Sequence, residues 1–89
     1  MDSITVKKIS ETEFDVTVGS SIQTRHRVTV PTDYCKQLTD GKVSAEELVE
    51  RSFEFLLQRE PNTSILSRFA LPVIGRYFPR YEQTIREML

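Results

Sequence analysis

The chain has 89 residues, of which 38% are hydrophobic and 28% are charged, and its formal net charge is −1. This balance is typical of a globular domain and excludes an intrinsically disordered chain. The slightly negative net charge also argues against a nucleic-acid-binding protein that is basic as a whole. The length suits one hydrophobic core, so we expect a single domain over residues 1–89.

The cysteine content and the apolar runs indicate the cellular compartment. Cys35 is the only cysteine in the sequence, which excludes an internal disulfide framework and favours a reducing environment. The first residues lack the basic region and the apolar stretch of a signal peptide. Uninterrupted apolar runs are only a few residues long, far short of a membrane span. We therefore expect a cytoplasmic protein that has no contact with a membrane.

The first third of the chain alternates apolar and polar residues, as half-buried strands do. The alternation predicts strands over 3–9, 13–18 and 21–30. Gly19 and Ser20 suit a two-residue hairpin between the second and third strands. Because both connections are short, the strands should form a three-stranded antiparallel sheet with one face open to solvent.

Helices are predicted after the sheet, which makes the fold α+β. Ser44 and Glu47 form a capping box, the start signal of a main helix over 44–59. The apolar residues of this helix cover a wider face than one sheet surface needs, so a second covering layer or a dimer is expected. Apolar spacing and proline positions predict the remaining, shorter helices at 33–38, 63–69, 72–78 and 79–88.

Two residues with catalytic potential, His26 and Cys35, have a simpler structural interpretation. His26 shares the inward face of its strand with Ile22 and Val28, where a hydrogen-bonded, partly buried histidine is more common than a catalytic one. No nucleophile motif surrounds Cys35, and free cysteines are usually packing residues. We therefore expect no catalytic residues and a protein that is not an enzyme.

Cofactor and metal sites are also not predicted. The acidic residues of the main helix have no metal-ligand spacing and suit a solvated face. The three glycines, at 19, 41 and 75, are too far apart for a loop that cradles phosphate.

The last third of the chain carries the best candidate for a binding surface. Residues 61–89 contain four arginines and two glutamates, a charge of +2 against −3 for residues 1–60. Aromatic and basic side chains interleave here, and arginine and tyrosine are enriched in protein interfaces. The candidate partner-binding residues are Arg76, Tyr77, Arg80 and Tyr81. The alternative is that the aromatic residues pack in the core while the arginines extend over them.

One stretch resembles known families of small regulators. Its features are Val-Thr-Val-Pro at 28–31, Gly41, and a helix opened by Ser44 and paired glutamates. Over residues 27–60 this stretch resembles HicB-type antitoxins, in which a strand ending in Val-Pro leads through a glycine to a similar helix. It also resembles a ribbon-helix-helix unit, although the helix expected at 33–38 is about a turn too short. The resemblance implies a bacterial regulator that binds nucleic acid as a dimer.

These observations predict a non-catalytic interaction domain that binds another protein, or a second copy of itself, through the arginine–tyrosine segment. The alternative is a small nucleic-acid-binding or antitoxin-like regulator that acts as a dimer. A positive charge of two is small for a phosphate-binding surface, which favours a protein partner.

Overall fold

A four-stranded sheet forms one layer of the fold. The computed structural model describes residues 3–19 and 21–89. The strand order is β1-β2-β3-β4, with the first three strands antiparallel and β4 parallel to β3. The strands are β1 (Ser3–Lys8), β2 (Glu13–Gly19), β3 (Thr24–Thr29) and β4 (Arg68–Ala70).

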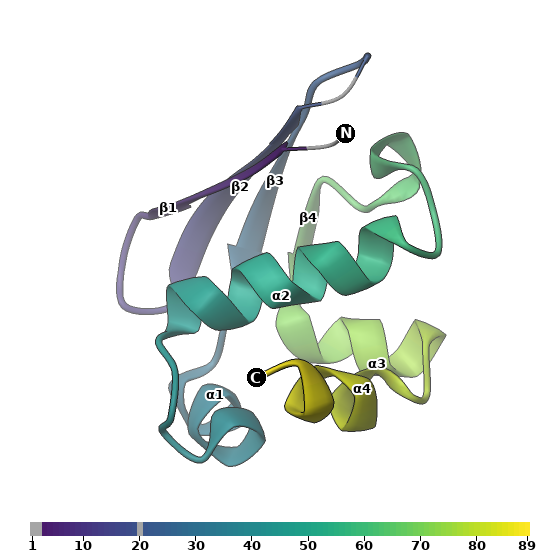
Figure 1. Ribbon diagram of the computed structural model, residues 1–89. Helices are drawn as coiled ribbons and strands as arrows, with labels where there is room; N and C mark the ends of the chain where they lie inside the picture. The colour runs from purple at the N-terminus through teal and green to yellow at the C-terminus, as the bar shows by residue number, and fades with distance from the viewer. Residues whose placement is uncertain (1–2, 20) are drawn as a thin grey trace.

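The helices lie on one face of this sheet (Figure 1). The long helix α2 crosses that face, and the shorter helices gather beyond it, so the other face of the sheet is uncovered. The helical elements are α1 (Thr32–Thr39), α2 (Ala45–Leu57), the 3-10 turns η1 (Asn62–Ser64) and η2 (Leu71–Val73), α3 (Ile74–Tyr77) and α4 (Tyr81–Met88). Within the described part of the chain, no helix is long and apolar enough to span a membrane.

Helix α2 packs on both sides, which explains its wide apolar face. Toward the sheet, the ring of Phe53 contacts His26 and Phe69, with centroids 5.3 and 6.1 Å away. Toward the C-terminal helices, the ring of Phe55 contacts Phe78 and Tyr81. The second covering layer is therefore supplied by the chain itself, and one core cluster joins β2 to α4.

The α+β prediction is confirmed, and the start of α2 follows the predicted chemistry. The hydroxyl of Ser44 accepts a hydrogen bond from the amide of Glu47 at 3.1 Å, which satisfies one of the free N–H groups of the first turn. The three predicted strands and the helices near 33–38, 72–78 and 79–88 are present with shifted ends.

The helix predicted over 63–69 is wrong. Only η1 is helical there, and the chain then extends into β4, which pairs with β3. The amide of Arg27 donates to the carbonyl of Ser67 at 2.8 Å. Residues 68–70 therefore pair with the free edge of β3. An unpaired strand edge offers backbone hydrogen-bonding groups, whereas a short isolated helix is only marginally stable.

The start of the third strand also differs from the prediction. The strand begins at Thr24, not at residue 21, so the connection from Gly19 is longer than two residues; Ser20, half of the predicted hairpin pair, lies outside the described residues. Ile22 was expected on the inward face but is 62% exposed. Its carbonyl accepts a hydrogen bond from the side chain of Asn62 at 2.7 Å, which holds this segment against η1 instead of in the sheet.

Candidate functional site

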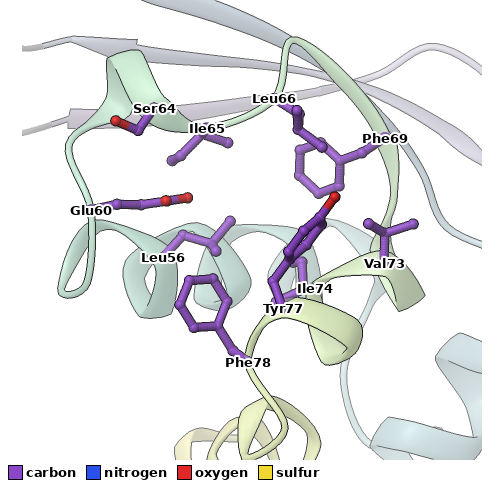
Figure 2. Close-up of a pocket in the computed structure, with 10 residues that line it drawn as sticks. All are labelled: Leu56, Glu60, Ser64, Ile65, Leu66, Phe69, Val73, Ile74, Tyr77 and Phe78. Atoms are coloured by element: carbon purple, nitrogen blue, oxygen red, sulfur yellow. The ribbon is translucent and has the colours of Figure 1, made fainter.

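A groove opens between the end of α2 and the C-terminal segment (Figure 2). Its cavity has a volume of about 400 Å³. That volume lies within the range of ligand-binding pockets, roughly 300–1,000 Å³. Its floor is apolar and its rim carries a few polar groups. The lining comes from Leu56 and Glu60 at the end of α2, from Ser64, Ile65 and Leu66 after η1, from Phe69 of β4, and from Val73, Ile74, Tyr77 and Phe78.

The wall formed by the 62–67 segment is held by a chain of partly buried hydrogen bonds. The Nδ1 of His26 lies 2.8 Å from the carbonyl oxygen of Leu66, and a carbonyl can only accept, so Nδ1 carries the proton. The Nε2 of His26 lies 2.9 Å from the hydroxyl of Thr24. That hydroxyl accepts from the Nδ2 of Asn62 at 2.9 Å, and Asn62 also donates to the carbonyl of Ile22. This chain fixes the groove wall to the sheet.

The sequence-based interpretation of His26 agrees with this geometry. The side chain is 3% exposed and has a partner on each ring nitrogen. Its face packs on Phe53, so it holds two segments of the chain together that are 40 residues apart. Cys35 lies on α1, which follows the far end of β3 (Figure 1). The thiol is half-buried beside the core, as a packing residue would be.

The four candidate partner-binding residues lie in two different environments. Tyr77 is 68% exposed, and its ring stands at the groove with the hydroxyl directed toward Phe69 (Figure 2). Arg76 and Arg80 are exposed next to it. Tyr81 is fully buried and cannot contact a partner. We therefore leave Tyr81 out of the candidate surface and keep the other three residues.

Tyr81 has a structural partner inside the core. The hydroxyl of Ser52 donates to the carbonyl of Leu48 at 2.7 Å, so it accepts the proton of the Tyr81 hydroxyl, 2.6 Å away. Burial raises the pKa of Tyr81, because an ionised phenol would lose its hydration. The hydroxyl of Tyr34 donates to the carboxylate of Glu82 at 2.9 Å. Burial is the larger cause that raises the pKa of Tyr34, and this hydrogen bond is the second.

Glu60 is the charged residue that lines the groove. Its side chain is half-buried, and its carboxylate points into the cavity between Leu56 and Ile65 (Figure 2). No described side chain pairs with this carboxylate through an ion pair or a hydrogen bond. The neighbouring Arg59 is held elsewhere, with its guanidinium 3.6 Å above the ring of Phe55. The groove therefore combines an apolar floor with one unpaired negative charge.

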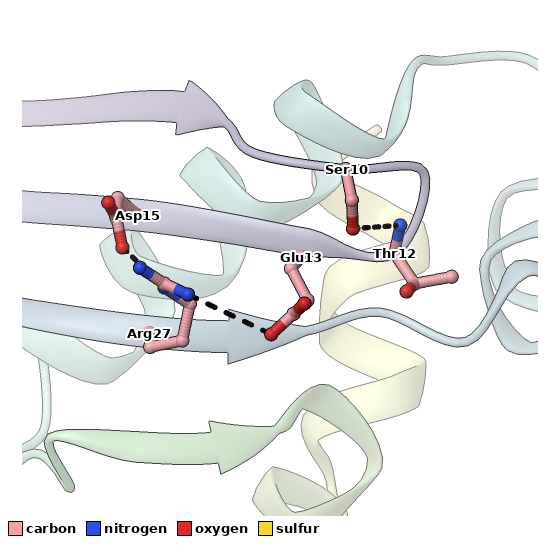
Figure 3. A network of polar contacts seen from close by, with 5 residues as sticks. All are labelled: Ser10, Thr12, Glu13, Asp15 and Arg27. Carbon is pink, nitrogen blue, oxygen red and sulfur yellow. Dashed lines mark hydrogen bonds and ion pairs between the residues drawn. The ribbon is translucent and has the colours of Figure 1, made fainter.

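A second candidate surface is the uncovered face of the sheet. Arg25 and Arg27 project from β3, and Arg68 is the register partner of Arg27 on β4. Figure 3 shows Arg27 between Asp15 and Glu13, with which it forms ion pairs. The hydrogen bond from Arg27 lowers the pKa of Asp15, because it favours the charged carboxylate.

Reasoning from sequence did not identify Glu60 or Leu66 as groove residues. The predicted main helix ends at residue 59, directly before Glu60, and Leu66 falls in the helix predicted over 63–69, which does not form. The signal available was a carboxylate directly before Pro61, a residue that keeps the main helix from continuing past this position.

Metal chemistry has no candidate centre in the part of the chain that the structure describes. Over residues 3–19 and 21–89, no group of three or more His, Cys, Asp or Glu side chains is placed to hold a metal ion.

Comparison of the chain with protein-family models, with curated proteins and with solved structures found no match.

Proposed function

We propose that this protein is a non-catalytic interaction module that binds another protein at the groove and the adjacent residues Arg76, Tyr77 and Arg80. The observation that carries the proposal is the exposed ring of Tyr77 at the edge of a cavity of about 400 Å³ with an apolar floor. Tyrosine and arginine beside an apolar pocket are typical of the residues that contribute most to binding energy in protein interfaces.

The exposure of apolar groups supports this assignment. Leu66 and Tyr77 are 50% and 68% exposed, and both line the groove. Isolated exposed apolar residues are common, but here two of them flank one concave surface, where a partner would remove both from water. The surrounding segment is held to the sheet through His26, so the groove is formed before a partner arrives. A preformed site avoids part of the ordering cost of binding.

The proposal is tested by affinity capture from a bacterial lysate, with and without nuclease, followed by mass spectrometry. The variants are Arg76→Ala and Tyr77→Ala, and the matched control is Ile9→Ala, because Ile9 is a 44% exposed apolar residue on the far hairpin. We expect one protein to bind in stoichiometric amount and to stay bound after nuclease treatment. Tyr77→Ala should abolish this binding, and Ile9→Ala should retain it. Retention in all three variants, with each folded by circular dichroism, would refute this binding surface.

A second candidate function is nucleic-acid binding by the uncovered face of the sheet. The observation that favours it is the neighbouring positions of Arg25, Arg27 and Arg68, of which Arg25 and Arg68 form no ion pair among the described residues. Arginine binds phosphate through paired hydrogen bonds. A dimer would double this basic face, in keeping with the resemblance to HicB-type antitoxins.

The second function predicts binding of labelled single-stranded RNA or duplex DNA that weakens steeply with salt, since each neutralised phosphate releases counterions. The double variant Arg25→Ala/Arg68→Ala should lower the affinity and reduce the salt slope by about 2. Arg76→Ala/Arg80→Ala, which removes two positive charges from another exposed surface, is the control. Affinity that is unchanged by salt and by the double variant would exclude this face.

A further inference from the structure

We propose that the partner enters the groove with a peptide segment in which an apolar side chain fills the cavity and a neighbouring lysine or arginine pairs with Glu60. This inference rests on the proposed function and specifies the partner's chemistry.

The unpaired carboxylate of Glu60 carries the argument. It is half-buried already, and it points into the apolar cavity without a cation among the described side chains (Figure 2). A partner that covered it with apolar groups alone would remove its remaining water, and an unpaired buried charge is costly. A cationic group on the partner restores the lost interaction. The groove thus favours a basic residue over a neutral or acidic one at this position.

The shape of the cavity decides the form of the occupant. Its floor is formed by buried side chains, among them Ile65, Phe69 and Ile74, while Leu66 and Tyr77 at its edge are exposed. The cavity is therefore open along one side, so a side chain can enter while its backbone stays outside. Glu60 and Tyr77 come from different walls of the groove (Figure 2), which lets a peptide run from one to the other.

The charges around the groove disfavour a second copy of this chain as the occupant. Arg76 and Arg80 lie on either side of Tyr77 in the sequence, and both are exposed. In a symmetric pair whose grooves face each other, each arginine near the twofold axis meets its own equivalent, and like charges across an interface are repulsive. The same arginines suit a partner whose basic residue is followed, beyond the apolar anchor, by an acidic one.

The experiment is a selection from a library of random 12-residue peptides displayed on phage, carried out against the full chain. The variants are Glu60→Gln and Glu60→Lys. The control is Glu50→Lys, which makes the same charge change on an exposed position of α2 that does not line the groove. Selected peptides are then synthesised, and their affinities are measured by fluorescence anisotropy.

We expect the wild-type chain to enrich peptides with an apolar residue next to a lysine or arginine. Glu60→Gln should weaken them by about tenfold or more, in the range of a hydrogen bond to a charged group. Glu60→Lys should select acidic residues at the same position, and Glu50→Lys should select the wild-type motif.

Four results would overturn the inference. If the selected peptides lack a basic residue, or bind the wild type and Glu60→Gln with equal affinity, Glu60 does not contribute to recognition of the partner. If no peptide is enriched, or if sedimentation shows a dimer that Tyr77→Ala dissociates, the groove has another occupant. If binding depends on Tyr77 but not on Glu60, the proposed function stands and only the partner's chemistry is wrong; if it depends on neither, both fail.

Discussion

Replacing Tyr81 and Tyr77 in parallel separates a core tyrosine from a binding tyrosine in one experiment. Tyr81→Phe keeps the ring and removes one buried hydrogen bond, leaving a lone pair of Ser52 without its donor. A hydrogen bond of this kind contributes about 1 kcal/mol to the free energy of unfolding. In a domain of this size that corresponds to a fall in Tm of roughly 4–8 °C.

Truncating each tyrosine to alanine should increase the difference in stability between the two variants. Tyr81→Ala also removes a fully buried ring that meets Phe55 edge-on at 5.3 Å, and such changes cost about 3–5 kcal/mol. Native domains have only about 5–15 kcal/mol in total, so this variant should be close to unfolding at 37 °C. Tyr77→Ala, at a 68% exposed position, should change stability by less than about 0.5 kcal/mol.

The assay is urea denaturation followed by far-UV circular dichroism, with the midpoint and the slope fitted for each variant. Tyr81→Phe should lower the midpoint without changing the slope, because the surface exposed on unfolding stays the same. Equal stabilities of Tyr81→Phe and wild type, or equal losses in Tyr77→Ala and Tyr81→Ala, would refute the assignment of these residues to core and surface.

Other perturbations test the hydrogen-bond chain, the helix start and the titrating groups. His26→Ala should cost about 2–4 kcal/mol, measured by urea denaturation, since it leaves partly buried polar partners unpaired and opens a cavity beside Phe53. Ser44→Ala should cost about 1 kcal/mol through loss of the N-cap, with Ser67→Ala, at an exposed position, as its control. Burial raises the pKa of the Tyr81 phenol above its ordinary value of 10.0, so the unfolded chain loses this proton at a lower pH than the folded chain does. The contribution of the protonated phenol to the free energy of unfolding should therefore be fully present below pH 10 and should fall as the pH rises further. Tyr81→Phe should reduce that fall. Arg27 lowers the pKa of Asp15 below 3.8, so its contribution is present above that pH and is lost on further acidification; Asp15→Asn should remove this part of the acid dependence, and an unchanged acid limb would contradict it.

Local sequence signals predicted the elements whose cause is local. The N-cap at Ser44 opens α2, and Pro61 keeps the helix from continuing, because both residues act within about one helical turn. The alternation in β2 shows directly in its burial, since Phe14, Val16 and Val18 are all fully buried. For the same reason the burial of His26 could be expected from its place in the strand pattern.

The groove could not be predicted in the same way. Residues 68–70 form a strand only because β3 presents a free edge about 40 residues earlier in the chain, and three residues are too few to show alternation. Tyr77 and Tyr81 are equally aromatic and equally close to arginines, yet one is exposed and the other fully buried. The difference arises because the side chain of Tyr81 points toward α2, where it contacts Phe55, and the side chain of Tyr77 does not.

The sequence by itself therefore determined the α+β class, the three antiparallel strands and the main helix, because hydrophobic period, caps and prolines act over a few residues. Only the tertiary structure decided the pairing of β4 with β3, the burial of Tyr81 and the direction of the Glu60 carboxylate into the groove. Each of these depends on contacts between segments distant in the chain, and the pattern of either segment alone does not contain them.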